Sequence, residues 1–334
     1  MSKKILIAPL DWGLGHASRC ITLIRQQVLN GNEVVIAANG SCAALLQKQF
    51  PTLRFIADIP SYNIGYASGS GMVWQMMKQA PRIVQTIGAE NKWLTNLLER
   101  ETFDEVISDN RYGLHHENVT CTFITHQLFI RAPMLFRPLL NALVKKYVSR
   151  FDRCWIPDYE GDDNLSGALS HGKTALTHVQ YIGPLSRFSK LESVNDGEQK
   201  YFALAIISGP EPQRTIFQNL ITGVFGQTGK PCAILCGQPQ TVAQFKSGNI
   251  DFFTHAEDEQ FVQLVQQSAH IVCRSGYSTI MDLNALNRKV LLVPTPGQTE
   301  QEYLATFHEA NGHHLCLTQH QLNIHSLLQK FEAL

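Results

Sequence analysis

The sequence predicts an α/β protein composed of two Rossmann-like, doubly wound parallel-sheet domains. Short apolar segments that suit buried strands alternate with helical segments, and this alternation occurs twice along the chain. A polar interval over residues 158–173, rich in Gly, Asp, Asn and Ser, separates the two series. The length of 334 residues suits two domains better than one. We therefore expect an N-terminal domain over 1–157, an interdomain linker region over 158–195, a C-terminal domain over 196–320 and a final helix over 321–334.

The N-terminal series begins with a βαβ unit, which is typical of a parallel sheet. A buried strand over residues 3–9 leads through a short loop into a helix that Gly31 ends, and a second strand follows over 32–39. The apolar residues of that helix recur at a spacing that places them on one face: Ala17, Cys20, Ile21, Ile24 and Val28. Further strands are predicted over 53–58, 104–109, 121–126 and 154–157, and helices over 72–100 and 134–150.

The C-terminal series repeats the same alternation. We predict strands over 202–208, 232–236, 270–274 and 290–294. Helices are expected over 213–225, 258–267, 278–286 and 321–331, and no strand follows the last of them. This order again indicates a parallel sheet with helices packed against it.

The charge balance and the hydrophobicity exclude two classes of protein. The 28 basic residues balance the 28 acidic ones, so we expect no basic surface for nucleic acid. No stretch approaches a membrane-spanning helix, and the apolar run after Lys4 is too short for a signal peptide, which predicts a cytoplasmic protein. The eight cysteines are scattered, and the closest pair, Cys232 and Cys236, lies in an apolar run. This placement indicates buried free thiols and no zinc site.

The loop over 11–16 follows the first strand, where ligands bind in open α/β sheets. Gly13 and Gly15 would let the backbone turn tightly and approach a ligand. His16 falls in the first turn of the helix, and histidine is the side chain best suited to accept a proton near neutral pH. A capping or merely hydrogen-bonded histidine is the alternative interpretation of this segment.

Two polar clusters end other strands of the N-terminal series. One contains Asp109, Asn110 and Arg111, and the other contains His126. Because the carboxyl ends of parallel strands share one edge of the sheet, we expect these residues beside His16, where they would contact the molecule whose proton His16 accepts. Ordinary loop polarity explains each residue equally well when it is taken alone. We expect His16 to be the catalytic base, with Asp109 orienting its partner, and the reverse assignment stays open.

Residues 271–303 form the strongest candidate for a site that binds a phosphate-containing ligand. A strand ends at Arg274, a loop follows, and a helix begins near Ser278. A helix N-terminus can hold a diphosphate through backbone N–H groups and its dipole, without a metal ion. Asp282, on the same helix, could accept hydrogen bonds from a ribose. Gln301 opens the next helix after a proline-rich turn over 294–297, where its side chain could contact sugar hydroxyls.

The segments RSGYST (274–279), VPTPG (293–297) and QEY (301–303) resemble the donor-binding signature of GT-B glycosyltransferases of the MurG-like group. GLGHASR (13–19) resembles, less closely, the glycine-rich loop and histidine of that family. The resemblance implies two Rossmann-like domains that face each other across a cleft. It also implies a UDP-sugar held mainly by the C-terminal domain, and inversion at the anomeric carbon.

The resemblance also implies roles for individual residues. Gly276, Ser278 and Thr279 would lie by the diphosphate, Asp282 would hold the ribose, and Gln301 and Glu302 would contact the donor sugar. The family has two adjacent glutamines there, so Glu302 is a departure that bears on the identity of the sugar. The remaining donor contacts implied are Arg187, Ser208, Gly209, Arg214, His255 and Arg274.

Together these observations predict a hexosyl- or N-acetylhexosaminyltransferase that uses a nucleotide-sugar and a glycan or lipid-linked acceptor. The sequence has no D-x-D pair, and Asp162 and Asp163 suit a solvated pair in the polar interval, so neither a metal ion nor a cofactor is expected. A nucleotide-sugar hydrolase of the same fold shares the opening GLGHASRC and is the main alternative. A non-catalytic nucleotide-sugar-binding subunit is a further one.

The predicted helix over 134–150 carries a broad apolar face surrounded by basic residues. Such a helix can lie on an anionic membrane surface, which would suit a lipid-linked acceptor and a location at the inner face of the cell membrane. A packed helix with a solvated basic rim is the interpretation that the pattern favours.

Overall fold

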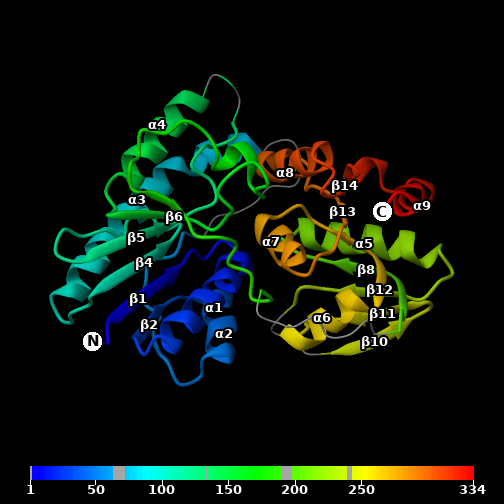
Figure 1. Cartoon of the computed structure of the whole chain (residues 1–334), viewed down its shortest axis with the longest axis horizontal. Helices are drawn as coiled ribbons and strands as arrows, with labels where there is room; N and C mark the ends of the chain where they lie inside the picture. Colours follow the sequence, from blue (N-terminus) through cyan, green and yellow to red (C-terminus); the bar gives the residue numbers. More distant parts are fainter. Residues whose placement is uncertain (1, 63–71, 133, 135, 190–197, 239–242) are drawn as a thin grey trace. The chain divides into compact units, whose positions relative to one another are not determined.

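The computed structural model describes residues 2–62, 72–132, 134, 136–189, 198–238 and 243–334. The chain divides into two compact units, and the division falls between Arg187 and Phe188 (Figure 1). The two Rossmann-like domains that the sequence predicts are therefore confirmed, and each is described by itself below.

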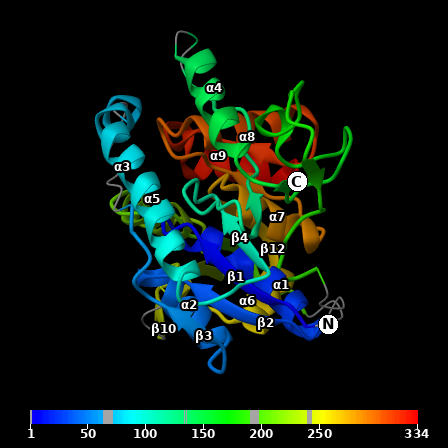
Figure 2. The ribbon, with the colours of Figure 1, turned by 90° about the vertical axis from the view of Figure 1, so that its left-hand side faces the viewer.

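The first unit is a parallel sheet of seven strands in the order β3-β2-β1-β4-β5-β6-β7. The strands are β1 (Lys4–Pro9), β2 (Glu33–Ala37), β3 (Arg54–Ile56), β4 (Glu105–Asp109), β5 (Thr120–Ile124), β6 (Arg153–Ile156) and β7 (Val179–Tyr181). The helices are α1 (Leu14–Leu29), α2 (Gly40–Gln49), α3 (Met72–Leu98) and α4 (Arg137–Val148), with the 3-10 turn η1 (Gly167–Leu169). Figure 2 views this unit end on, with the long helix α3 running beside the sheet.

Two features of the first unit differ from the sequence prediction. Val28, expected on the buried face of α1, is 42% exposed because it lies in the last turn, beyond the sheet that buries Ile21 and Ile24. The predicted linker from Asp158 onward is folded onto this unit up to Arg187. The buried Asp158 carboxylate accepts hydrogen bonds from the backbone N–H groups of residues 165 and 166, and β7 pairs with β6. Local hydrogen bonds thus order a segment whose composition suggests a loop.

The second unit has a sheet of seven strands in the order β10-β11-β9-β8-β12-β13-β14. The strands are β8 (Tyr201–Ile206), β9 (Cys232–Leu235), β10 (Gln244–Ser247), β11 (Ile250–Phe253), β12 (Ser268–Cys273), β13 (Leu291–Leu292) and β14 (Leu315–Cys316). The helices are α5 (Gln213–Gly226), α6 (Asp258–Gln266), α7 (Tyr277–Ala285), α8 (Thr299–Ala310) and α9 (Ile324–Glu332), with the 3-10 turn η2 (Gln319–Gln321).

One edge of the second sheet is antiparallel, which the sequence analysis missed. β10 and β11 form a hairpin whose two-residue turn is Gly248-Asn249. Gly248 has a φ of 58°, a left-handed conformation that suits glycine and matches the twist of a tight hairpin. The other pairings of this sheet are parallel.

Both sheets reverse their strand order next to the first strand of the unit. The reversal lies between β1 and β4 in the first sheet and between β8 and β12 in the second. Ligands of doubly wound folds bind beyond the carboxyl ends of the strands at such a point. The loops that follow these four strands are therefore where a functional site is expected.

Candidate active site

Four polar side chains meet at the carboxyl edge of the first sheet. Asp109 is the last residue of β4, and His126 follows β5 by two residues. Gly13 precedes α1 with a φ of 146°, which favours glycine and lets the chain turn from β1 into the helix at once. His16 and Arg19 then lie three residues apart on α1, so both point from the same face of the helix.

Arg19 links the cluster together. Its Nε donates to Asp109 Oδ2 at 2.7 Å, and its Nη2 contacts Oδ1 of the same carboxylate, so the pair is bidentate. Its Nη1 lies 3.0 Å from Nδ1 of His126. Arg19 is 2% exposed and Asp109 is fully buried. A buried pair of this kind holds its geometry, because a shift would leave a charge unpaired.

His16 completes the cluster through its Nδ1 atom. That nitrogen lies 3.1 Å from Asp109 Oδ1 and 2.8 Å from Arg19 Nη2. The two contacts exclude each other, since Nδ1 either carries a proton and donates a hydrogen bond to the carboxylate or is unprotonated and accepts a hydrogen bond from the guanidinium. Only the first arrangement leaves Nε2 unprotonated and able to act as a base.

The charges of the cluster fix its protonation. Burial lowers the pKa of His16; Asp109 counteracts this in part and the Arg19 charge reinforces it, so the imidazole is held neutral. Burial by itself raises the pKa of Asp109, but the Arg19 charge and the hydrogen bonds from Arg19 and His16 outweigh it and hold that pKa well below its usual range. The site therefore pairs an ionised carboxylate with a neutral imidazole, which is the combination that general base catalysis requires.

The second unit brings the predicted donor segments together at the edge where β12 ends. The Ser275 hydroxyl donates to the backbone oxygen of Gln301 at 2.8 Å, and the Gln301 side chain accepts from the backbone N–H of Thr295 at 2.9 Å. The Glu302 side chain accepts from the N–H of Gly297 at 2.8 Å. These bonds join the loop before α7 to the proline-rich turn and the start of α8.

The other predicted donor residues of this unit lie at loops of the same edge. Gly276 is the N-cap of α7, Ser278 and Thr279 are in its first turn, and Asp282 is buried one turn later. Ser208 and Gly209 follow β8, and Gly209 has a φ of 104°. Arg214, in the first turn of α5, pairs with Glu211 and donates to the Cys236 backbone oxygen at 3.0 Å. His255 follows β11 and is partly exposed, and Arg187 is the last residue of the first unit.

Comparisons with known proteins relate the whole chain to one enzyme class. It is 25% identical over 330 residues to an uncharacterized glycosyltransferase of Methanosarcina mazei, with 93% of this chain and 84% of the relative covered. A relative of the same description from Methanosarcina acetivorans is 26% identical, with 93% and 82% covered. Residues 212–334 match the model of the glycosyltransferase family 28 C-terminal domain. Residues 212–334 are therefore similar to a family 28 C-terminal domain, and the chain has the GT-B fold.

Solved structures agree on the fold. The glycotransferase of kitacinnamycin matches this chain with a TM-score of 0.67 at 13% identity, covering 100% of this chain and 90% of the other. Acinetobacter baumannii MurG matches with a TM-score of 0.60 at 14% identity, with the same coverage. The spinosyn rhamnosyltransferase SpnG, solved with thymidine diphosphate, gives 0.64 at 15% identity, covering 99% and 91%.

Arg111 is a correction to the predicted acceptor side. It is fully buried, and its guanidinium donates to the backbone oxygens of Pro9 and Pro60 at 2.7 and 2.8 Å. It also pairs with the buried Glu90 at 2.9 Å, which in turn accepts from Tyr62. Arg111 therefore fixes the ends of β1 and of the loop after β3, and no acceptor can reach it.

Arg274 is a second correction, on the predicted donor side. It is 1% exposed, and it donates to the backbone oxygens of Val293 and Pro294 at 3.1 Å and to the Gln319 side chain at 2.7 Å. Its guanidinium lies over the Phe217 ring, 4.0 Å from the centroid. Burial lowers its pKa to about 10. Arg274 thus holds the turn after β13 in place instead of contacting a diphosphate.

Asn110 and His126 remain at the predicted edge of the sheet. Asn110 has a φ of 60°, which asparagine tolerates better than most residues, and its N–H bonds to the Ile124 oxygen at 3.0 Å. The strained turn directs the chain away from β4 immediately after Asp109. Sequence reasoning missed Arg19, although its spacing of three residues from His16 on a predicted helix was a usable signal.

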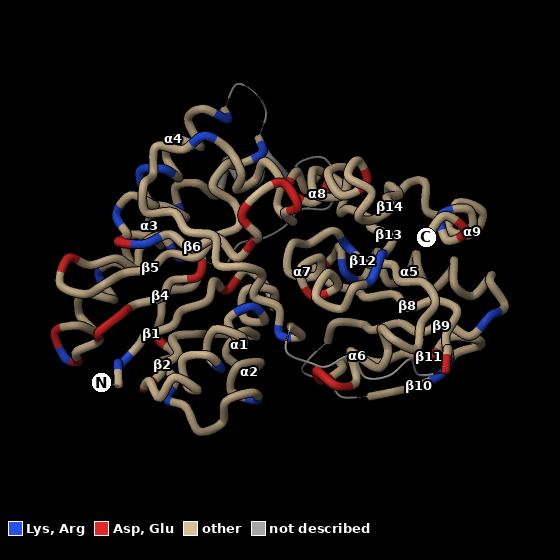
Figure 3. The backbone as a smooth tube through the Cα atoms, in the orientation of Figure 1, with Lys and Arg blue, Asp and Glu red and all other residues tan. Residues whose placement is uncertain are grey.

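The helix α4 is less buried than a packed helix would be. Leu139 and Leu143 are 71% and 40% exposed, while Val144 and Val148 on the opposite side are buried. Basic residues lie along α4 and beside it (Figure 3). Within the described part of the chain, no helix is long and apolar enough to cross a membrane.

Proposed function

We propose that this glycosyltransferase moves a hexose or N-acetylhexosamine from a UDP-linked donor to an acceptor hydroxyl, with inversion in a single displacement. The observation that carries the proposal is the contact of His16 with the buried Asp109–Arg19 pair. That contact supports a neutral imidazole with a fixed orientation at the carboxyl edge of the sheet, which is what a general base needs.

In the proposed step, Nε2 of His16 accepts the proton of the acceptor hydroxyl. The acceptor oxygen forms a bond to the anomeric carbon while the bond from that carbon to the diphosphate oxygen breaks. The nucleoside diphosphate leaves with the electron pair. Asp109 accepts the hydrogen bond from Nδ1–H of His16 and stabilises the imidazolium that forms.

The proposed donor site is the edge of the second sheet beside α7. Backbone N–H groups of the first turn, from Gly276 to Thr279, would face the diphosphate, and the helix dipole would stabilise its charge. Asp282 would accept from the ribose, and Gln301 and Glu302 would contact the sugar. Arg187, Ser208, Gly209, Arg214 and His255 stay predictions for the same donor. The rhamnosyltransferase solved with thymidine diphosphate supports a nucleoside diphosphate as leaving group.

We further propose that departure of the diphosphate depends on the helix dipole and on backbone N–H donors and not on a metal ion or another cofactor. The absence of a D-x-D pair from the sequence supports this. A glycan or a lipid-linked molecule is the proposed acceptor, bound on the side of Gly13, Gly15, Asn110 and His126. The exposed leucines and basic residues of α4 support peripheral contact with an anionic membrane at its cytoplasmic face.

A nucleotide-sugar hydrolase is the second candidate, and one observation favours it. Arg19 and Cys20, both in the GLGHASRC segment that resembles such hydrolases, contact Asp109 directly, with the Cys20 thiol 3.5 Å from Oδ2. The same base would then activate water. The two activities use the same donor chemistry and differ only in the nucleophile.

Two measurements test the proposal. A thermal-shift screen of nucleotide-sugars identifies the donor, because a ligand that binds only the folded state raises the apparent melting temperature by mass action. Product analysis with the identified donor, with and without candidate glycan and lipid-linked acceptors, separates the two activities. Sugar joined to an acceptor supports a transferase, free sugar formed at the same rate in every mixture supports a hydrolase, and no response to any nucleotide-sugar overturns both.

A further inference from the structure

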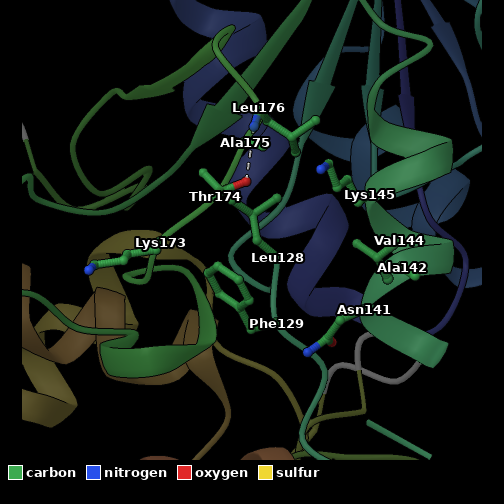
Figure 4. A pocket seen from close by; sticks show the side chains of 10 residues that line it. All are labelled: Leu128, Phe129, Asn141, Ala142, Val144, Lys145, Lys173, Thr174, Ala175 and Leu176. Atoms are coloured by element: carbon green, nitrogen blue, oxygen red, sulfur yellow. Dashed lines mark hydrogen bonds between the residues drawn. The ribbon is translucent and has the colours of Figure 1, made fainter. Parts of the chain in front are cut away.

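A pocket of about 340 Å³ opens in the first unit, between α4, the loop after β5 and the segment 173–176 (Figure 4). Its volume is in the range of small-molecule sites. Most of its wall is apolar, with Leu128 and Phe129 from the loop, Val144 from α4 and Leu176 from the third segment. A ligand with an apolar part fits such a wall.

The charge of the pocket has one sign. Among the residues that the structure describes, Lys145 and Lys173 are its only charged lining residues, and no acidic side chain lines it. In Figure 4 the ammonium of Lys145 points toward Leu128 and the 174–176 segment, whereas that of Lys173 points away from them. Within the described residues Lys145 makes no ion pair. A cation directed at an apolar wall favours a ligand that is both apolar and anionic.

The loop after β5 connects this pocket to the catalytic cluster. His126, which contacts Arg19, and Leu128, which lines the pocket, are two residues apart. The loop is fixed at the pocket by two bonds, from Phe129 N–H to the Leu169 oxygen at 2.9 Å and from Ile130 N–H to Asn141 Oδ1 at 2.8 Å. A ligand held here would therefore contact the loop that carries His126 into the cluster, in the unit proposed for the acceptor.

We propose that this pocket binds the non-reacting part of the acceptor, which consists of an apolar group attached to a phosphate or carboxylate. The apolar group lies against Leu128, Phe129 and Leu176, and the anionic group pairs with Lys145. The assignment of this ligand as the acceptor rests on the proposed function, whereas the binding chemistry of the pocket does not.

Octyl phosphate, a soluble molecule with both features, is the first probe. Calorimetric titration of the full chain should detect binding, and Lys145→Met should weaken it about ten- to a hundredfold, the usual worth of a hydrogen bond to a charged group. Lys146→Met is the matched control, since Lys146 has the same charge on the same helix but does not line the pocket. Octanol should bind wild type and Lys145→Met equally weakly.

A second variant tests the apolar wall. Ala175→Trp adds a large ring at an exposed position of the lining and should abolish octyl phosphate binding while leaving nucleotide-sugar binding intact. Sedimentation with phosphatidylglycerol vesicles then identifies the source of the ligand. Loss of vesicle binding in Ala175→Trp indicates a lipid headgroup, and unchanged vesicle binding indicates a soluble acceptor.

Absence of octyl phosphate binding, or equal losses in the Lys145 and Lys146 variants, would overturn the pocket assignment. Neither result touches the proposed function, which depends on nucleotide-sugar turnover. Conversely, if octyl phosphate binding depends on Lys145 but the chain transfers no sugar, the pocket assignment stands and the proposed transferase activity is rejected.

Discussion

Asp109→Asn separates the structural role of the buried ion pair from its catalytic role. Asn keeps the shape of Asp but removes the charge that pairs with Arg19, which is 2% exposed. Removing one partner of a buried pair costs about 3–5 kcal/mol because the other charge is left uncompensated. Asn retains one oxygen acceptor and Arg19 keeps its contact with His126, so we expect the lower end of that range, about 3 kcal/mol.

The same change should lower the turnover number by about two to four orders of magnitude, the usual worth of a positioned base. An amide at residue 109 can donate to Nδ1 of His16, which favours the tautomer whose Nε2 is protonated and cannot accept a proton. Turnover is measured with the donor found by thermal shift. Stability is measured by urea unfolding followed through tryptophan fluorescence, which reports the first unit because all four tryptophans precede residue 156.

The double variant Arg19→Met/Asp109→Asn is the control that separates the two effects. It replaces the whole ion pair with uncharged groups of similar size, which is often neutral for stability. We expect its free energy of unfolding to recover to within about 1 kcal/mol of wild type while turnover stays low. Full stability of the single Asp109→Asn variant would refute the buried pair, and near-normal turnover of the double variant would refute the role of Asp109 in orienting His16.

Four further outcomes follow from the proposed function. His16→Ala should lower turnover by about two to four orders of magnitude and leave donor affinity unchanged, since we place the donor in the second unit; a proportional loss of donor binding would make His16 a ligand contact. The pKa of His16 is lowered from 6.5, so the acid limb of the pH profile of kcat/KM should lie below pH 6.5. Arg19→Gln removes a charge that lowers this pKa and should therefore move the acid limb to higher pH. An acid limb that moves to lower pH would contradict the assignment of His16 as the base. Ser278→Pro and Asp282→Ala should weaken nucleotide-sugar binding in a titration with the fold intact, and turnover should survive a chelator unless the proposed metal-free departure is wrong.

The sequence predicted the sheets and the meeting of His16, Asp109 and His126 at one edge because both depend on local patterns. A buried strand, a glycine and a helix in immediate succession lead from β1 to His16, and Asp109 ends the next strand of the sheet. These features need only the period of the apolar residues and the rule that parallel strands end on one edge. The very short strands β7, β13 and β14 have too few residues for any period to be read.

The two arginine corrections have a common physical cause. Arg111 and Arg274 each follow a strand in a polar run, which is where ligand-binding arginines are found. In the structure both guanidiniums are buried and donate to backbone oxygens of neighbouring loops, Pro9 and Pro60 in one case and Val293 and Pro294 in the other. Five donors in a rigid fork can bind loop carbonyls as well as a phosphate. Sequence alone does not reveal which loops will approach.

Arg19 was missed because it lies inside the helix α1 and not in a polar run after a strand. Its burial bears on what the site does. A buried arginine–carboxylate pair is not a means of gaining stability, since apolar residues of the same volume would stabilise the fold as well or better. Arg19 and Asp109 nevertheless occupy the carboxyl edge of the sheet, in contact with a neutral histidine. The Arg19 charge holds the carboxylate ionised, and burial, reinforced by that charge, holds the imidazole unprotonated. These are the states that a base needs. We therefore propose that catalysis, and not stability, accounts for this pair.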